Sequence, residues 1–259
     1  MKTKSLGFIG GGRITKIILQ AFENSGIIFE KIVVSDTNQE VLNSLKHKFP
    51  KIIVTTDNLK EVVQNEIVFI ALHPPVLMDT LAKVKDFVNK DSVLVSLAPK
   101  LTIEKMAVVL GGSTNIARMN PSASAIVNKG VNPITFSRDM QVEVKNKLLE
   151  LMRSLGSTPV VEESKIEAYA VITAMGHTYY FFQFQKLKEL AVSYGMNEKE
   201  AQTAITEMLW GTTETLFKSG LSFKEVADLV PVKPMGEVEE TIKGYYDQYL
   251  NGIFSKIKP

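Results

Sequence analysis

The stretch LGFIGGGRIT, residues 6–15, decides the fold of this chain of 259 residues. Its apolar start, Leu6 to Ile9, predicts a buried strand, and the three glycines that follow break that strand into a turn. Apolar residues then recur at helical spacing from Ile14 to Ala21. A strand, a glycine turn and a helix in this order bring backbone N–H groups and a helix N-terminus to one point. That arrangement favours the binding of a pyrophosphate.

A second strand, Lys31 to Ser35, ends in Asp36, where an acid that binds an adenine ribose is expected. The carboxylate would accept hydrogen bonds from a ribose 2′-OH and repel a 2′-phosphate, which favours NAD. Ser35 and Thr37 are short polar donors to a phosphate, so NADP stays open. Two alternatives need no ligand: Asp36 caps a helix that begins near Gln39, and the glycine turn only permits close packing.

The composition is typical of a soluble globular protein, with 45% hydrophobic and 22% charged residues. A net charge of +2 without a basic run gives no sign of nucleic-acid binding. The absence of cysteine excludes disulfides and fits a reducing cytoplasm, and three scattered histidines predict no metal site. Ala168 to Phe184 is uncharged but too short and polar to predict a membrane span. The first strand begins too early for a signal peptide, so we expect a cytoplasmic protein.

Strands alternate with amphipathic helices as far as Val161, and only helical periodicity follows Glu163. This pattern predicts an α/β fold, with a Rossmann dinucleotide-binding domain at residues 1–162 and an all-α domain at 163–259. The expected strands are 6–9, 31–35, 52–54, 67–72, 92–97, 115–119, 134–136 and 159–161. The expected helices are 15–24, 41–49, 58–64, 76–87, one after Thr102, 142–155, 166–194, 198–218, 222–229 and 236–257.

Several stretches together resemble the pyrroline-5-carboxylate reductases, within the 6-phosphogluconate-dehydrogenase-like superfamily, over nearly the full length. GFIGGGRI at 7–14 is similar to the family's GFIGAGNM, and ALHP at 71–74 stands where the family has a V-K-P turn that lines the nicotinamide. VSLA at 95–98 resembles its S-x-A strand end, and RMNPSASA at 118–125 its R-x-M-P-N-T-P-A loop. VITAMGHTY at 171–179 stands where the family has A-L-S-G-S-G-P-A-Y.

The resemblance implies an NAD- or NADP-dependent oxidoreductase that transfers a hydride to a C=N or C=O bond of a small metabolite. It also implies a helical C-terminal domain that interlocks with a second copy in a homodimer. The expected cofactor contacts are Gly10, Gly11, Gly12, Arg13, Ile14, Ser35, Asp36, Thr37, Ala71, Leu72, His73, Pro74 and Ala98. A non-catalytic nucleotide-binding homologue that acts through its helical surface is one alternative, and an F420-dependent reductase is another.

The departures from the family pattern concentrate at the substrate end. His73 replaces the turn lysine, and Ser122 replaces the loop asparagine. Before Gly176, the bulkier Met175 stands where the family has a small residue. The family's S-P-G-G-T-T element, which holds the substrate carboxylate, is replaced by VKPMGE at 232–237. We therefore expect Ser122, Met175 and Gly176 to contact a substrate that differs from the family's own.

His177 and Tyr179 are the candidate catalytic residues. A protonated imine needs only positioning, whereas a carbonyl needs an acid that protonates the developing alkoxide. Histidine side chains titrate near neutrality, which makes His177 the more plausible donor. The alternatives are a histidine bonded across a dimer interface and a packed tyrosine. The aromatic run from Tyr179 to Phe184 covers all sides of a helix, which predicts burial against a partner subunit.

Overall fold

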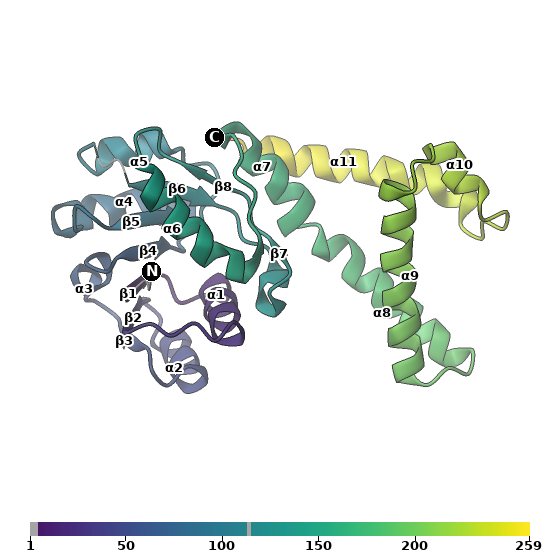
Figure 1. The fold of residues 1–259 in the computed structure, drawn as a ribbon, viewed down its shortest axis with the longest axis horizontal. Helices are drawn as coiled ribbons and strands as arrows, with labels where there is room; N and C mark the ends of the chain where they lie inside the picture. The colour runs from purple at the N-terminus through teal and green to yellow at the C-terminus, as the bar shows by residue number, and fades with distance from the viewer. Residues whose placement is uncertain (1–4, 113–114) are drawn as a thin grey trace. The chain divides into compact units, whose positions relative to one another are not determined.

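The computed structural model describes residues 5–112 and 115–259. A seven-stranded sheet organises the first part of the chain, in the order β3-β2-β1-β4-β5-β6-β8 (Figure 1). All neighbours pair in parallel except β6 and β8, which are antiparallel. The strands are β1 (Ser5–Ile9), β2 (Lys31–Ser35), β3 (Ile53–Thr55), β4 (Ile67–Ile70), β5 (Val93–Ser96), β6 (Ile116–Met119) and β8 (Ile134–Phe136). The strand order reverses at β1, and this switch point is where doubly wound sheets bind ligands.

Helices cover both faces of this sheet, because alternate residues of each strand point to opposite sides. Phe8 and Phe69 are paired in register, stack with ring centroids 4.8 Å apart and pack in the core beneath α1, α2 and α6. Their neighbours Ile9 and Ile70 pack in the second core, beneath α3, α4 and α5. These helices are α1 (Arg13–Asn24), α2 (Gln39–Lys48), α3 (Leu59–Val63), α4 (Pro74–Val84), α5 (Ile103–Val109) and α6 (Val142–Met152). The predicted Rossmann architecture is confirmed.

The strand expected at 159–161 is wrong. Only Val160 forms an isolated parallel bridge, to Ile134. Pro159 has no N–H, so it offers the ladder only the carbonyl oxygen that accepts the N–H of Ile134. A two-stranded sheet forms nearby instead, from β7 (Gly130–Val131) and β9 (Gly156–Ser157).

The helix expected at 166–194 is interrupted. The chain forms α7 (Ile166–Tyr169), a π-helical turn (Ala170–Ala174) and then α8 (His177–Ser193). Three further helices follow: α9 (Glu198–Lys218), α10 (Phe223–Asp228) and α11 (Glu239–Ile257). The α9 bounds agree with the prediction, and a capping box between Asn197 and Glu200 fixes its start.

The chain forms two compact units. The first comprises Met1–Met175 with Phe254–Pro259, and the second comprises Gly176–Ile253. Domain limits at 1–162 and 163–259 stay a prediction about the family's modules. No helix within residues 5–112 and 115–259 combines the length and apolar character that a membrane crossing requires.

The glycine in β1 gives a test of this packing. A Cβ at Gly7 would lie 2.2 Å from the Val62 carbonyl oxygen, so α3 must shift away from β1. We expect Gly7→Ala to lower the free energy of unfolding by about 3 kcal/mol, the cost of a severe overpacking. Gly12→Ala is the matched control and should change it by less than about 1 kcal/mol, because a Cβ added there would meet no atom within 4 Å. Urea unfolding measures both, and equal midpoints would contradict the packing described.

Candidate functional site

The glycine turn lies at the carboxyl end of β1, beside the end of β4. Gly10 has a φ of +102°, and a Cβ there would lie 2.5 Å from the Ala71 carbonyl oxygen, so only glycine fits. The Gly10 N–H donates to the Ser35 carbonyl oxygen at 2.7 Å. Helix α1 begins at Arg13, and open space surrounds Gly12. A helix N-terminus next to open space is suited to a phosphate group.

Two side chains fix the shape of the turn. The buried Thr15 hydroxyl donates to the Gly10 carbonyl oxygen at 2.6 Å, from the position where the dinucleotide fingerprint has its third glycine. The Asp36 carboxylate accepts the Gly11 N–H at 2.7 Å and the Asn38 N–H at 2.9 Å. The acid at the end of β2 and the glycine turn at the end of β1 are therefore held as one unit.

The alternative that Asp36 caps α2 is wrong. Asn38 is the N-cap, and its side-chain oxygen accepts the N–H of Glu40 at 2.9 Å. Asp36 is half-buried, with Ser35 buried before it and Thr37 exposed after it. This leaves the carboxylate beside the turn, at the place where an adenine ribose is expected.

The ends of β4 and β5 supply the other predicted cofactor contacts. His73 is exposed at the N-cap of α4, its side chain makes no capping bond, and Pro74 opens the helix. Ala71 and Leu72 are half-buried, and Ala98 is buried just beyond β5. Because β2, β1, β4 and β5 are parallel neighbours, their carboxyl ends share one edge of the sheet. On α1, Arg13 is exposed and Ile14 packs partly into the core.

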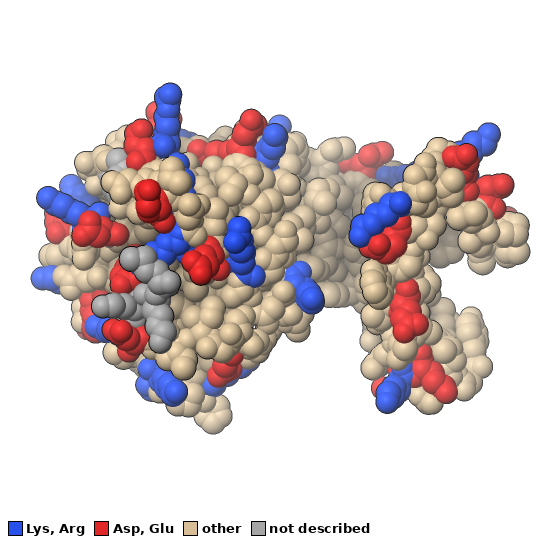
Figure 2. All heavy atoms as spheres, viewed as in Figure 1, with Lys and Arg blue, Asp and Glu red and all other residues tan. Residues whose placement is uncertain are grey.

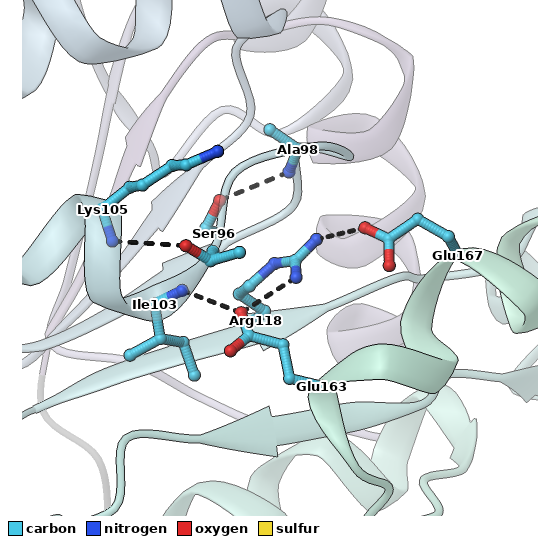
Figure 3. A network of polar contacts seen from close by, with 8 residues as sticks. Ser96, Ala98, Ile103, Lys105, Arg118, Glu163 and Glu167 are labelled. Atoms are coloured by element: carbon cyan, nitrogen blue, oxygen red, sulfur yellow. Dashed lines mark hydrogen bonds and ion pairs between the residues drawn. The ribbon is translucent and has the colours of Figure 1, made fainter. Parts of the chain in front are cut away.

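A buried ion-pair network lies at the end of β6 (Figure 3). Arg118 Nη1 is 2.9 Å from Glu163 Oε1, and Arg118 Nη2 is 2.6 Å from Glu167 Oε1. The side chains of Arg118 and Glu167 are only 1% and 2% exposed. Glu163 Oε1 also accepts the Ile103 N–H at 2.8 Å, which ties α5 to the network.

In the sequence, Arg118 was expected only as part of the loop motif, and neither Glu163 nor Glu167 was predicted as a site residue. Their i, i+4 spacing, which places Glu163 and Glu167 on one helical face, is the signal that could have found them. The π-helical turn that follows α7 was also missed, and no sequence signal marks it. Such turns occur frequently at functional sites.

The three predicted substrate contacts lie on separate segments of the chain. Ser122 is buried, and its hydroxyl accepts the Val131 N–H at 3.0 Å and lies 3.1 Å from the Ser124 hydroxyl oxygen. This hydroxyl is therefore used inside its own loop. Met175 is the last residue of its stretch of the first unit, and Gly176 begins the second unit. All three stay predictions.

The predicted catalytic residues lie near the start of α8, in the second unit. The His177 ring stacks on Phe181 at 5.8 Å, and the Tyr179 ring meets the Tyr246 ring edge-on at 6.1 Å. Partial burial raises the pKa of the Tyr179 hydroxyl, and the nearby Tyr246 raises it further. The phenol therefore stays protonated well above neutral pH. Both residues stay predictions.

Large apolar side chains are exposed on the second unit when one chain is considered alone. Helix α8 has no buried residue. The most exposed aromatic side chains of α8, α9 and α11 are Phe181, Phe182, Trp210, Phe217 and Tyr249. So much aromatic surface is typical of a protein–protein interface.

The charged side chains on the surface are mixed in sign. On the face drawn in Figure 2, acidic and basic side chains are interspersed. Among the described residues of that face, no basic stripe of the kind that follows a phosphate backbone is visible. Residues 5–112 and 115–259 also contain no group of three histidine or acidic side chains placed to hold a metal ion.

Two family models match separate parts of the chain. Residues 5–100 match "NADP oxidoreductase coenzyme F420-dependent", and residues 163–256 match "Pyrroline-5-carboxylate reductase dimerisation". Pyrroline-5-carboxylate reductase of Methanosarcina acetivorans is 26% identical, over 98% of this chain and 92% of its own length. The Escherichia coli enzyme is also 26% identical, over 93% and 89%. Together, the two matches and these relatives support the pyrroline-5-carboxylate reductase family. The chain is an NAD(P)-dependent oxidoreductase of that type.

Solved structures of this family share the fold. Pyrroline carboxylate reductase of Plasmodium falciparum, solved with NADP bound, has a TM-score of 0.82 at 19% identity and covers 100% of this chain and 98% of its own. The Coxiella burnetii reductase has a TM-score of 0.71 at 24% identity, with 99% and 95% covered. The predicted order of a Rossmann part followed by a helical part is confirmed.

The ion-pair network gives the second prediction. Glu167→Ala leaves the buried Arg118 guanidinium with one carboxylate, and we expect a loss of about 3 kcal/mol in the free energy of unfolding. Glu163→Ala should cost about 1 kcal/mol, because solvent replaces part of that more exposed partner. Thermal and urea unfolding measure both variants. A smaller loss for Glu167→Ala than for Glu163→Ala would contradict the burial described.

Proposed function

We propose that this reductase transfers a hydride from NADH or NADPH to the C=N bond of a small metabolite. The hydride adds to the carbon of a protonated imine, the C=N electron pair moves to nitrogen, and the products are an amine and the oxidised cofactor. The observation that carries the proposal is the glycine turn locked by Asp36 and Thr15, on the same sheet edge as Ala98. Residues of the turn would hold the pyrophosphate, Asp36 the adenine ribose, and Ala71 to Pro74 with Ala98 the nicotinamide end.

The substrate pocket differs from the family pattern. The relatives are named for pyrroline-5-carboxylate, a cyclic imine that carries a carboxylate. In this chain the Ser122 hydroxyl is used within its loop, and the carboxylate-holding S-P-G-G-T-T element is absent. These differences support an altered imine or, with His177 or Tyr179 as proton donor, a carbonyl substrate.

We also propose that the active form is a homodimer built through the helical part. The match to a dimerisation model and the exposed aromatic side chains of α8 and α9 support this assembly. Burial of such apolar side chains at an interface is the usual driving force for an obligate dimer.

The test is turnover of pyrroline-5-carboxylate, followed as loss of NADH and NADPH absorbance in parallel, and then of other cyclic imines and ketones. Turnover of an imine supports the proposal, turnover of ketones alone would favour the carbonyl substrate, and a preference for a substrate without a carboxylate supports the altered pocket. Cofactor binding without turnover of any imine or ketone would favour a non-catalytic homologue. Turnover only with reduced F420 would favour the F420-dependent alternative, to which the first family model's description also refers.

Asp36 gives a prediction about cofactor choice. Its carboxylate lies 2.7 Å from the Gly11 nitrogen and would repel a 2′-phosphate, so we expect NADH to bind more tightly than NADPH. Asp36→Ala should move the ratio of the two affinities toward NADPH by about tenfold, which corresponds to about 1.4 kcal/mol. Asp91→Ala removes an exposed carboxylate just before the amino end of β5, away from the glycine turn, and is the control that should leave both affinities unchanged. Equal weakening of both nucleotides by Asp36→Ala would contradict this role.

Tyr179 and His177 can be separated by pH. If the Tyr179 hydroxyl donates the proton to a carbonyl substrate, its raised pKa keeps it protonated, and the rate should stay level as pH rises from 7 to about 9. A rate that falls over that range would contradict a Tyr179 donor. Tyr179→Phe should then lower kcat at least about tenfold with His177→Ala nearly silent, and the reverse result would assign the proton to His177.

A further inference from the structure

A small cavity lies where β5 and β6 end, within the first unit. Its walls include Ala98 from the loop after β5, Arg118 and Asn120 from the end of β6, and Glu167 and Ala170 from the helix that follows. It has room for about one water-sized group. Ala98 is the predicted contact to the nicotinamide, so the cavity borders the proposed reaction centre.

Two residues that line this cavity carry buried nitrogens without an acceptor. Within residues 5–112 and 115–259, the buried side-chain nitrogens without a hydrogen-bond partner are Arg118 Nε and Asn120 Nδ2. Buried polar groups in native proteins are nearly always hydrogen-bonded. Two unsatisfied N–H groups on residues that line one small cavity therefore indicate an acceptor that the chain itself does not supply.

The charge balance determines which kind of acceptor fits. Arg118 carries one positive charge, and the carboxylates of Glu163 and Glu167 already contact it. The network thus has one negative charge in excess, and a further anion in this poorly hydrated space would be repelled. A neutral oxygen, such as that of a carbonyl or carboxamide, accepts both N–H groups without this repulsion.

The second donor is also a departure from the family pattern. In the R-x-M-P-N-T-P-A loop, Arg118 is retained, whereas Asn120 stands at the position of the apolar methionine. An asparagine adds an N–H group that methionine cannot offer. The change gives this chain a paired-donor arrangement that the motif itself does not contain.

We propose that Arg118 Nε and Asn120 Nδ2 together form a subsite for a neutral carbonyl oxygen at the reaction centre, with Asn120 as its specificity-determining residue. The inference rests on the proposed function, because the oxygen arrives with a bound molecule. It comes either from the carboxamide of the nicotinamide or from a carbonyl or amide group of the substrate. Glu163 and Glu167 act as positioning residues, since they hold the guanidinium in place.

The test is calorimetric titration of the full chain with NAD⁺, with nicotinic acid adenine dinucleotide and with ADP-ribose. The second probe carries a carboxylate in place of the carboxamide, and the third lacks the ring. If the oxygen belongs to the carboxamide, wild type should bind NAD⁺ about tenfold more tightly than the carboxylate analogue. Asn120→Leu, nearly isosteric and without a donor, should weaken NAD⁺ binding about five- to tenfold and leave ADP-ribose binding unchanged.

Asn115→Leu is the matched control, because Asn115 lies at the opposite end of β6 and donates to the Lys90 carbonyl oxygen. It should leave all three affinities unchanged. Asn120→Met, which restores the residue of the family motif, serves as the second variant should Asn120→Leu fold poorly, as judged by thermal unfolding.

If the oxygen belongs to the substrate, nucleotide binding stays unchanged in Asn120→Leu, while KM for the carbonyl- or amide-bearing substrate rises about five- to tenfold. That outcome also supports the subsite. Unchanged nucleotide affinities together with unchanged KM would mean that the cavity holds only a water molecule, and the inference would be overturned. Wild type that binds none of the three probes would instead refute the proposed function itself.

Discussion

The close approach of two backbone segments at Gly10 is the constraint on which the rest of the cofactor region depends. A side chain at this position would collide with the Ala71 carbonyl oxygen, and the φ of +102° is one that other residues rarely adopt. The ends of β1 and β4 can meet only because position 10 is glycine. The α1 N-terminus then points at open space, and the Thr15 and Asp36 side chains fix the turn in that shape.

A second constraint acts at the other side of the same edge. The Arg118 guanidinium is buried and must keep its two carboxylates, so the end of β6 and the start of the helical region are held together. This network lies in the first unit, although Glu163 and Glu167 fall within the stretch that matches the dimerisation model. The family's division into sequence modules and the compact units of the structure therefore differ at this point.

Local patterns predicted most of the fold. The apolar runs that became β1, β4 and β5 needed only their own residues to be found, and the Asn197 cap fixed the start of α9. Features that depend on distant partners were missed. Nothing near Asp36 shows that its acceptor role is toward Gly11, and nothing near Arg118 identifies Glu167, 49 positions away. The π-helical turn at 170–174 lacks glycine and proline, so helical periodicity continued through it in the prediction.

The site was predicted unevenly, because only part of it is a contiguous sequence pattern. The turn residues and Asp36 form a contiguous pattern, and the structure gathers them at one sheet edge. The residues predicted for the substrate end, such as Ser122 and His177, lie far apart in the sequence, and no local motif links them. The most direct measurement is calorimetric titration of the full chain with NADH and NADPH at matched ionic strength. We expect saturable binding, tighter for NADH, at one site per chain. Binding of neither nucleotide would mean that the glycine turn serves only close packing, and that the chain has no dinucleotide site.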